Sequence, residues 1–210
     1  MIVFPGSNCD TDVFEALQKT GFDVSYTWHQ EVLNVKNLGL CVIPGGFSYG
    51  DYLRSGAIAA SLPIMQSVRE FANEGGNVIG ICNGFQILTE AKLLRGALVR
   101  NSGGNFICKN VRLKLSSGDS KFTAGCKNEM LMQVAHADGR YICDEADLRY
   151  LKENDMIAFE YLEDVNGSTD RIAGVFGGVN KNILGMMPHP ERSMASEDGM
   201  VIFQNILNSI

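Results

Sequence analysis

The chain has 210 residues, enough to bury a core without disulfides or metals, and we expect one domain over residues 1–210. Its net charge of −6 and pI near 5.1 argue against binding to a nucleic-acid backbone. No basic leader is present, and no apolar run approaches the roughly 18 residues that a membrane span needs. We therefore expect a cytoplasmic protein with no membrane or nucleic-acid partner.

The first half of the sequence alternates short apolar runs with amphipathic segments, which is typical of βαβ units and a parallel sheet. Glycines at position 21 and at positions 75 and 76 follow the two amphipathic segments as stop signals. Strands are expected at residues 2–4, 22–28, 38–43 and 77–82, and helices at residues 12–19 and 63–74.

The second half is less regular, with strand-like runs at residues 111–115, 130–135, 156–162 and 172–176 and helices at residues 144–152 and 201–207. The first of these runs alternates apolar and polar residues, as a half-buried antiparallel strand does. We expect an α/β fold with an open, flavodoxin-like, mostly parallel sheet, helices on both faces and antiparallel additions.

Six cysteines are scattered without a Cys-x-x-Cys pair, so the sequence indicates neither a zinc site nor a disulfide framework, and we expect no metal. Cys82 differs from the others because Gly80-x-Cys82-x-Gly84 joins an apolar strand to a helix, the pattern of a nucleophile elbow. The free N–H groups at the start of that helix would stabilise a thiolate. A buried, inert cysteine is the alternative for this position taken alone.

One of the three histidines lies in the segment Met187-Pro188-His189-Pro190-Glu191. Prolines on both sides of His189 favour extended backbone at the end of a strand. Side chains two apart in an extended chain point the same way, so Glu191 can hold one imidazole nitrogen of His189. The alternative is that Glu191 pairs with Arg192 or solvent and that His189 is a rigid turn residue.

Taken together, Cys82, His189 and Glu191 supply a nucleophile, a base and an orienting acid. The N–H of Asn83 and a backbone donor of the Gly46-Phe47 turn would complete an oxyanion hole. The sequence therefore predicts acyl transfer through a cysteine. A cysteine hydrolase or peptidase with another substrate, and a non-catalytic binding subunit, remain alternatives.

The motif Cys82-Asn-Gly-Phe-Gln86, with His189-Pro-Glu191, resembles the triad signature of class I glutamine amidotransferases. The segments PGGFSYGDYLRSG (residues 44–56) and GMMPHPER (residues 185–192) are similar to those of glutaminase subunits of phosphoribosylformylglycinamidine synthases, enzymes of purine biosynthesis. The resemblance extends over the whole chain.

The resemblance implies that Cys82 attacks the side-chain amide of glutamine, that His189 protonates the departing ammonia, and that water activated by His189 hydrolyses a glutamyl thioester. Glu191 would orient His189. The resemblance also assigns Gln86 and His136 to the glutamine pocket, although relatives more often read His-Gly-Glu-Gly where this chain has Ala137 and Asp138. The expected substrate-binding residues are Gly46, Phe47, Asn83, Gln86 and His136.

Neither a Gly-x-x-x-x-Gly-Lys-Ser/Thr phosphate loop nor a Gly-x-Gly-x-x-Gly motif occurs in the sequence. We therefore expect no cofactor in this chain, and we expect ATP and magnesium at a separate large synthetase subunit. The resemblance also implies a small accessory subunit. Because ammonia released into water would mostly become protonated, the synthetase is expected to dock over the mouth above Cys82 and receive ammonia through a closed path.

Overall fold

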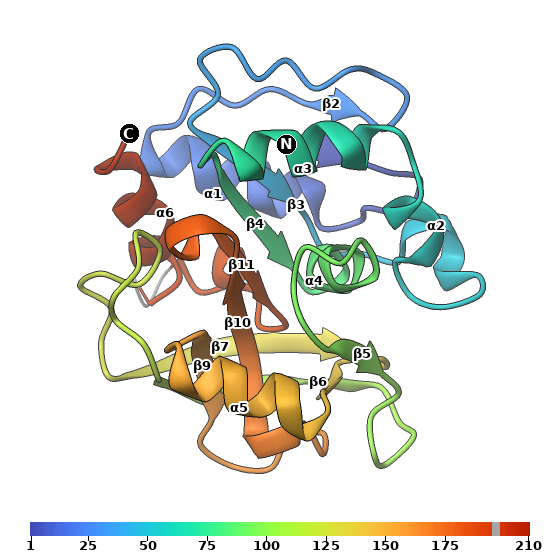
Figure 1. Ribbon diagram of the computed structural model, residues 1–210, viewed down its shortest axis with the longest axis vertical. Helices are drawn as coiled ribbons and strands as arrows, with labels where there is room; N and C mark the ends of the chain where they lie inside the picture. The colour runs from blue at the N-terminus through green and yellow to red at the C-terminus, as the bar shows by residue number, and fades with distance from the viewer. Residues whose placement is uncertain (195–197) are drawn as a thin grey trace.

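The computed structural model describes residues 1–194 and 198–210 and contains one seven-stranded sheet and two small two-stranded sheets (Figure 1). The strands of the large sheet lie in the order β3-β4-β11-β10-β9-β6-β7. Their bounds are β3 Leu40–Ile43, β4 Asn77–Ile81, β11 Ile183–Met186, β10 Ile172–Gly177, β9 Ile157–Tyr161, β6 Ile107–Leu115 and β7 Glu129–His136.

Helices lie around both ends of this sheet (Figure 1). The helices α1 and α3 lie near β3 and β4, and α5 lies near β9 and β6. The helix bounds are α1 Asp10–Thr20, α2 Ala57–Ala60, α3 Ile64–Asn73, α4 Asn83–Glu90, α5 Glu145–Glu153 and α6 Met200–Leu207. The small sheets pair β1 (Ile2–Val3) with β2 (Thr27–Trp28), and β5 (Ala97–Val99) with β8 (Arg140–Ile142).

The first three strands of the large sheet form its parallel part, since β4 pairs in parallel with both β3 and β11. Every residue of these strands is buried, which explains the continuous apolar run of β3 and the mostly apolar run of β4 in the sequence. The carboxyl ends of β3 and β4 point to the same edge of the sheet. That edge is where the sequence predicts the reactive cysteine.

The remaining four pairings of the large sheet are antiparallel. The predicted α/β class and the antiparallel additions are confirmed. The large sheet is mixed rather than mostly parallel, however, because more of its strand pairings are antiparallel than parallel. Along β7 buried and exposed residues alternate, because one face of this strand packs on the core and the other faces solvent. Such strands extend the sheet without crossover helices.

Most predicted helices and strands are present with ends shifted by one to four residues. Gly21 ends α1 in a left-handed conformation, and the Asp144 side chain caps α5 by accepting from the Asp147 N–H (2.8 Å). The sequence analysis did not predict β5, β8, β11 or α2, which are three or four residues long. Elements of that length leave too few residues to show a period.

The strand predicted over residues 22–28 is wrong except at its last two residues. Its partner β1 has two residues, so the ladder of hydrogen bonds cannot extend further. The alternating aromatic residues lie at the edge of the molecule, where Tyr26 and Trp28 are 46% and 44% exposed. The pattern therefore reflects a partly exposed segment rather than a sheet strand.

Among residues 1–194 and 198–210, no helix combines the length and the apolar character that crossing a membrane requires.

A buried asparagine joins α3 to the sheet at the start of β11. The Asn182 side-chain amide donates to the Ala72 carbonyl (2.8 Å) and to the Gly76 carbonyl (2.7 Å), and Asn182 is 3% exposed. Its backbone carbonyl accepts from the Val78 N–H (2.9 Å). Asn182 therefore donates hydrogen bonds to the carbonyls that follow or end α3, and it holds β11 against β4.

We expect Asn182→Ala to lower the free energy of unfolding by about 1–3 kcal/mol, because it removes two hydrogen bonds, and only the Ala72 carbonyl keeps a second donor, the Gly75 N–H (3.0 Å). Urea denaturation measures this change. The exposed Asn128 gives the matched control, and Asn128→Ala should have little effect. Equal midpoints for the two variants would contradict the assigned role of Asn182.

Candidate active site

Cys82 stands on the sharp turn between β4 and α4, with φ 51° and ψ −103°. This left-handed conformation is strained for a residue other than glycine, as in a nucleophile elbow. The turn is tight because a Cβ on Gly84 would lie 2.0 Å from the Ile43 carbonyl oxygen, and one on Gly80 would lie 2.6 Å from the Gly84 backbone. Both glycines of the predicted pattern are therefore required by close backbone contact.

His189 follows the end of β11 in the extended conformation that its flanking prolines predict, with φ −99° and ψ 94°. Its N–H donates to the Gln133 carbonyl on β7 (2.8 Å), and its Nδ1 lies 2.6 Å from Glu191 Oε1. Glu191 belongs to a 3-10 turn (η4, Pro190–Arg192). The predicted pairing is present, but it arises from a turn rather than from extended chain.

The charge of His189 is set by two opposing effects. Burial alone would lower the pKa of His189, but the Glu191 carboxylate and the nearby Cys82 outweigh burial and raise the pKa above the ordinary imidazole value. Nε2 of His189 is buried, and the Cys82 side chain is the group that interacts with the imidazole besides Glu191 in raising its pKa. The arrangement favours an imidazolium beside Cys82, as a thiolate nucleophile requires.

Gly45, at the end of β3, leaves the space that the catalytic side chains occupy. A Cβ on Gly45 would lie 2.9 Å from His189 Cε1, 3.2 Å from Cys9 Sγ and 3.4 Å from Cys82 Cβ. These three side chains therefore converge on one glycine. The structure thus brings the predicted nucleophile and base together, although they are far apart in the sequence.

Two backbone donors are available for an oxyanion near Cys82. The N–H groups of Asn83 and Gly46 make no backbone hydrogen bond within the described part of the chain. The Phe47 N–H, by contrast, donates to the Gly6 carbonyl (2.9 Å) and is already used. The sequence predicts a backbone donor from the turn at Gly46 and Phe47. Of these two residues, Gly46 has the free N–H.

The side chains of Asn83 and Gln86, both on α4, connect two loops around the pocket. The Ser48 N–H donates to Asn83 Oδ1 (3.0 Å), and Asn83 Nδ2 donates to Gln86 Oε1 (2.8 Å). Gln86 Nε2 in turn donates to the Asp138 carbonyl (2.7 Å). Both amides are therefore used within the protein, so these two predicted substrate-binding residues position the loops on either side of Cys82.

His136, at the end of β7, has a buried ring nitrogen, Nε2, that can accept a hydrogen bond. Asn101 Nδ2 donates to the carbonyls of Asn105 and His136 (both 2.9 Å), which leaves Asn101 Oδ1 as the acceptor facing His136 Nδ1 (3.1 Å). Burial, helped by the nearby His189, lowers the pKa of His136 to about 4. His136 is therefore neutral at pH 7 with its proton on Nδ1, and its buried Nε2 has no partner among the described residues.

These residues line a cavity of about 410 Å³ that holds Cys82, His189 and His136 together with Gly46, Phe47 and Gln86. Asn83 is fully buried behind it. The sequence analysis missed several lining residues: Asn8, Cys9, Asp51, Ser55, Phe106 and Arg192. Cys9 follows β1, and strand ends at this edge of the sheet are the signal that could have identified it.

Cys9, His189 and Glu191 offer three donor atoms within 4.8 Å of one another, the spacing of a metal site. Arg192 Nη2, however, lies 3.2 Å from Cys9 Sγ and supplies a positive charge there. Burial raises the pKa of the Cys9 thiol to about 12, so it stays protonated at neutral pH. The neighbouring guanidinium disfavours a cation at this cluster.

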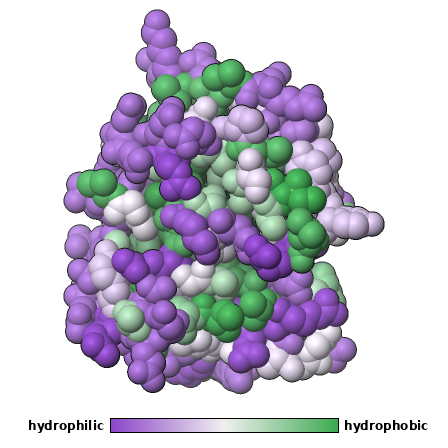
Figure 2. All heavy atoms as spheres, turned by 45° about the vertical axis from the view of Figure 1, so that its right-hand side comes forward, coloured by the Kyte–Doolittle hydropathy of each residue, from purple (hydrophilic) through white to green (hydrophobic). Residues whose placement is uncertain are grey.

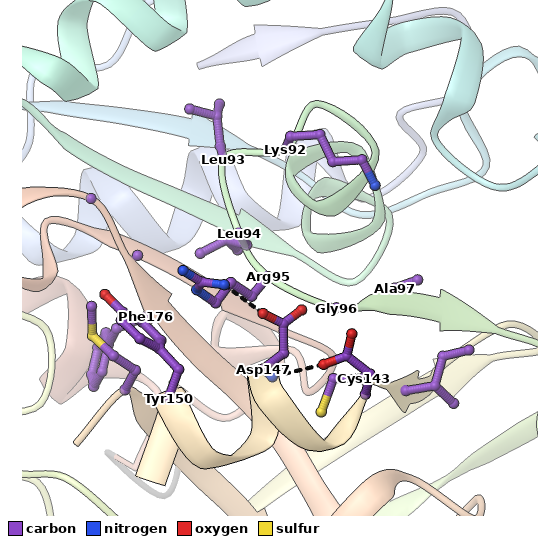
Figure 3. Close-up of a pocket in the computed structure, with 15 residues that line it drawn as sticks. Lys92, Leu93, Leu94, Arg95, Gly96, Ala97, Cys143, Asp147, Tyr150 and Phe176 are labelled. Carbon is purple, nitrogen blue, oxygen red and sulfur yellow. Dashed lines mark hydrogen bonds and ion pairs between the residues drawn. The ribbon is translucent and has the colours of Figure 1, made fainter. Parts of the chain in front are cut away.

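A larger cavity of about 840 Å³ lies elsewhere, between residues 92–97 and α5 (Figure 3). Asp147 pairs with Arg95, and the Arg95 guanidinium lies 3.9 Å from the centre of the Tyr150 ring. Among the described residues, no histidine lines this cavity, and burial raises the pKa of its one thiol, Cys143. The cavity therefore lacks the nucleophile and base that the smaller one brings together.

Comparisons with known proteins agree over nearly the full chain. A family model described as a CobB/CobQ-like glutamine amidotransferase domain matches residues 1–202. Relatives from Ruegeria sp. (strain TM1040) and Koribacter versatilis are 47% and 46% identical to this chain, cover 97% and 100% of it, and match over 94% and 97% of their own lengths. Both are named phosphoribosylformylglycinamidine synthase subunit PurQ.

Solved structures are similar as well. PurLQS from Thermotoga maritima contains a chain that is 43% identical, with a TM-score of 0.89, covering 99% of this chain and 96% of that one. A glutamine amidotransferase from the same organism is 16% identical with a TM-score of 0.62, covering 99% and 95% of the two chains. The second structure shares the fold alone.

We expect Gly45→Ala to slow alkylation of Cys82 by iodoacetamide at neutral pH by about tenfold or more, because the new methyl group displaces His189 and removes the cation that favours the thiolate. Mass spectrometry of the labelled peptide measures the rate. Gly103→Ala is the control, since nothing lies within 4 Å of that position. An unchanged rate in the Gly45 variant would show that His189 does not activate the thiol.

Proposed function

The chain belongs to the family of CobB/CobQ-like glutamine amidotransferases, and we propose that it is the glutaminase subunit of a phosphoribosylformylglycinamidine synthase. The observation that carries the proposal is the convergence of Cys82, His189 and Glu191 at one edge of the sheet, with His189 Nδ1 held 2.6 Å from the Glu191 carboxylate. The full-length similarity to subunits of that name gives the substrate class.

The reaction begins when the Cys82 thiolate attacks the carboxamide carbon of glutamine. The carbonyl oxygen becomes negatively charged, and the free N–H groups of Asn83 and Gly46 are placed to stabilise it. The C–N bond then breaks, and His189 gives its proton to the nitrogen, which leaves as ammonia. The product on the enzyme is a glutamyl thioester on Cys82.

Water completes the cycle. His189, now neutral, removes a proton from the water molecule that attacks the thioester carbon, and glutamate leaves as the thiolate is restored. Glu191 keeps the Nδ1 side of the imidazole occupied, so that Nε2 is the nitrogen that exchanges protons. The ion pair of thiolate and imidazolium is then ready for the next glutamine.

The ammonia is used by a large synthetase subunit, which converts formylglycinamide ribonucleotide to formylglycinamidine ribonucleotide in purine biosynthesis. We place ATP and magnesium on that subunit, assign no cofactor to this chain, and include a small accessory subunit in the complex. The PurLQS structure from Thermotoga maritima, which contains a similar chain, supports such an assembly. The complex would work in the cytoplasm.

The synthetase would dock around the mouth of the catalytic cavity. Four large side chains near this mouth are exposed by half or more: Phe47, Tyr52, Leu53 and Phe106. Phe47 and Phe106 themselves line the cavity. Figure 2 shows hydrophobic patches around a hollow on the face that carries α2 and β5. A partner covering these side chains would bury apolar surface and close the path that ammonia takes.

We expect Cys82→Ala to abolish glutamine-dependent synthesis by the assembled complex and to leave ammonia-dependent synthesis unchanged, because the variant removes only the nucleophile. Product formation from glutamine and from ammonium salts measures the two activities. Cys108 is exposed, and Cys108→Ala should retain both activities. Equal loss of both in the Cys82 variant would mean that the cysteine is structural.

The pH profile tests the role of Glu191. Its carboxylate raises the pKa of His189, so the imidazolium persists as pH rises and is lost only when pH passes that raised value. Glu191→Gln should therefore lower the pKa of His189 and move the alkaline limb of kcat/KM for glutamine to lower pH by about one unit or more.

The exposed Glu163, which pairs with Arg112, gives the control for this experiment. Glu163→Gln should leave the profile unchanged. An alkaline limb at the same pH in the Glu191 variant and the parent chain would show that another group governs it.

A further inference from the structure

One wall of the catalytic cavity carries acidic side chains that the triad does not use. Asp51 and Asp138 both line the cavity, and Asp138 Oδ2 accepts from Ser55 Oγ (2.8 Å). The two carboxylates are close enough that Asp138, after burial, raises the pKa of Asp51. Two adjacent carboxylates in a partly buried site repel each other, and only Asp138 has a paired cation among the described residues, the Arg100 guanidinium.

Ser55 gives Asp51 a side-chain hydrogen bond, but no cation pairs with this carboxylate among the described residues. Its Oδ1 is buried and accepts no hydrogen bond from any described residue. The nearby arginines are used elsewhere: Arg54 pairs with Glu90, and Arg192 with Asp12. Arg100 lies 3.7 Å from the other acid, Asp138, and is mostly exposed. An acceptor atom is therefore left open toward the cavity.

A second buried acceptor lines the same cavity. His136 is 3% exposed, is neutral, and carries its proton on the nitrogen that faces Asn101, so that its unpartnered Nε2 can only accept. His136 lies near both His189 and Asp138, since both influence its pKa. The unpartnered Oδ1 of Asp51 and Nε2 of His136 are both acceptors, and they call for a ligand with N–H donors and a positive charge.

The loop that carries Asp51 is strained and firmly held. Tyr49, Asp51 and Leu53 all have positive φ, at 53°, 55° and 69°. The Tyr49 N–H donates to the Pro5 carbonyl (2.8 Å), and the Arg54 guanidinium makes two bonds to Glu90 on α4 (2.9 and 2.7 Å). Strain of this kind persists only where the surroundings enforce it, and it is concentrated at ligand-binding positions.

We propose that Asp51, assisted by Asp138, binds the α-ammonium group of glutamine and so makes the enzyme select an amino-acid amide over a simple carboxamide. The inference rests on the proposed function, because it assumes that the carboxamide of glutamine lies at Cys82. The unpartnered Nε2 of His136 accepts from the N–H groups of that carboxamide. An ammonium group beside Asp51 supplies the cation that this carboxylate lacks among the described residues.

The test compares L-glutamine with glutaramate, which has the same carboxamide and chain but no amino group. In the complex with the synthetase, Asp51→Asn should lower kcat/KM for L-glutamine by about tenfold to a hundredfold, mainly through KM, because a charge-assisted hydrogen bond is lost. Turnover of glutaramate should stay unchanged, since it has no ammonium group to lose. Glu163→Gln is the matched control and should change neither.

Equal losses on both substrates in a folded Asp51→Asn chain would overturn the proposal, as would an unchanged kcat/KM for L-glutamine. If that variant does not fold, as judged by its thermal melting curve, Asp138→Asn is tested instead. We then expect a loss of kcat/KM for L-glutamine alone, and equal losses for L-glutamine and glutaramate would contradict the proposal. A parent complex that turns over neither amide would contradict the proposed function instead, so the two failures are distinguishable.

Discussion

The site depends on one steric constraint, which is that no Cβ fits between the ends of β3 and β4 and the start of α4. Gly84 brings the backbone of α4 against the Ile43 carbonyl, and Gly45 leaves room for Cys82 and His189 together. Protein interiors are packed too densely to absorb an extra methyl group at such contacts without moving their neighbours. The strained conformation of Cys82 is therefore maintained by packing.

The second half of the fold completes the site from another direction. β7 lies at the far edge of the large sheet, yet its Gln133 carbonyl accepts from the His189 N–H, and its last residue, His136, lines the catalytic cavity. The side chains of Asn83 and Gln86 join the loop after β3 to the loop after β7. The antiparallel strands thus build one wall of the cavity, opposite the elbow.

The sequence predicted those parts of the molecule that are determined by residues close together in the chain. Gly80, Cys82 and Gly84 define the elbow within five residues, and the prolines around His189 constrain its backbone without help from the rest of the chain. Strands of three or four residues are too short to show a hydrophobic period, and their pairing partners are distant in the sequence. The length of the antiparallel part and the short strands β5, β8 and β11 could therefore not be predicted.

The sequence also could not show that Asp51 and Asp138 line the same wall of the cavity. Asp51 and Asp138 occur in loops far apart in the chain, and only the fold places them beside one cavity. The amides of Asn83 and Gln86 show a related limit. A motif identifies which residues surround a pocket, but which atoms face the ligand and which hold neighbouring loops follows from hydrogen bonds that only coordinates reveal.

The position of His189 has a consequence for biosynthesis of the protein. The base follows β11, which is among the last strands to leave the ribosome, whereas the nucleophile emerges much earlier. Contacts between distant segments form late in folding, because the intervening chain must first be ordered. A nascent polypeptide that ends before β11 has the proposed nucleophile but not the proposed base, so chain order would delay the release of ammonia until the fold is complete.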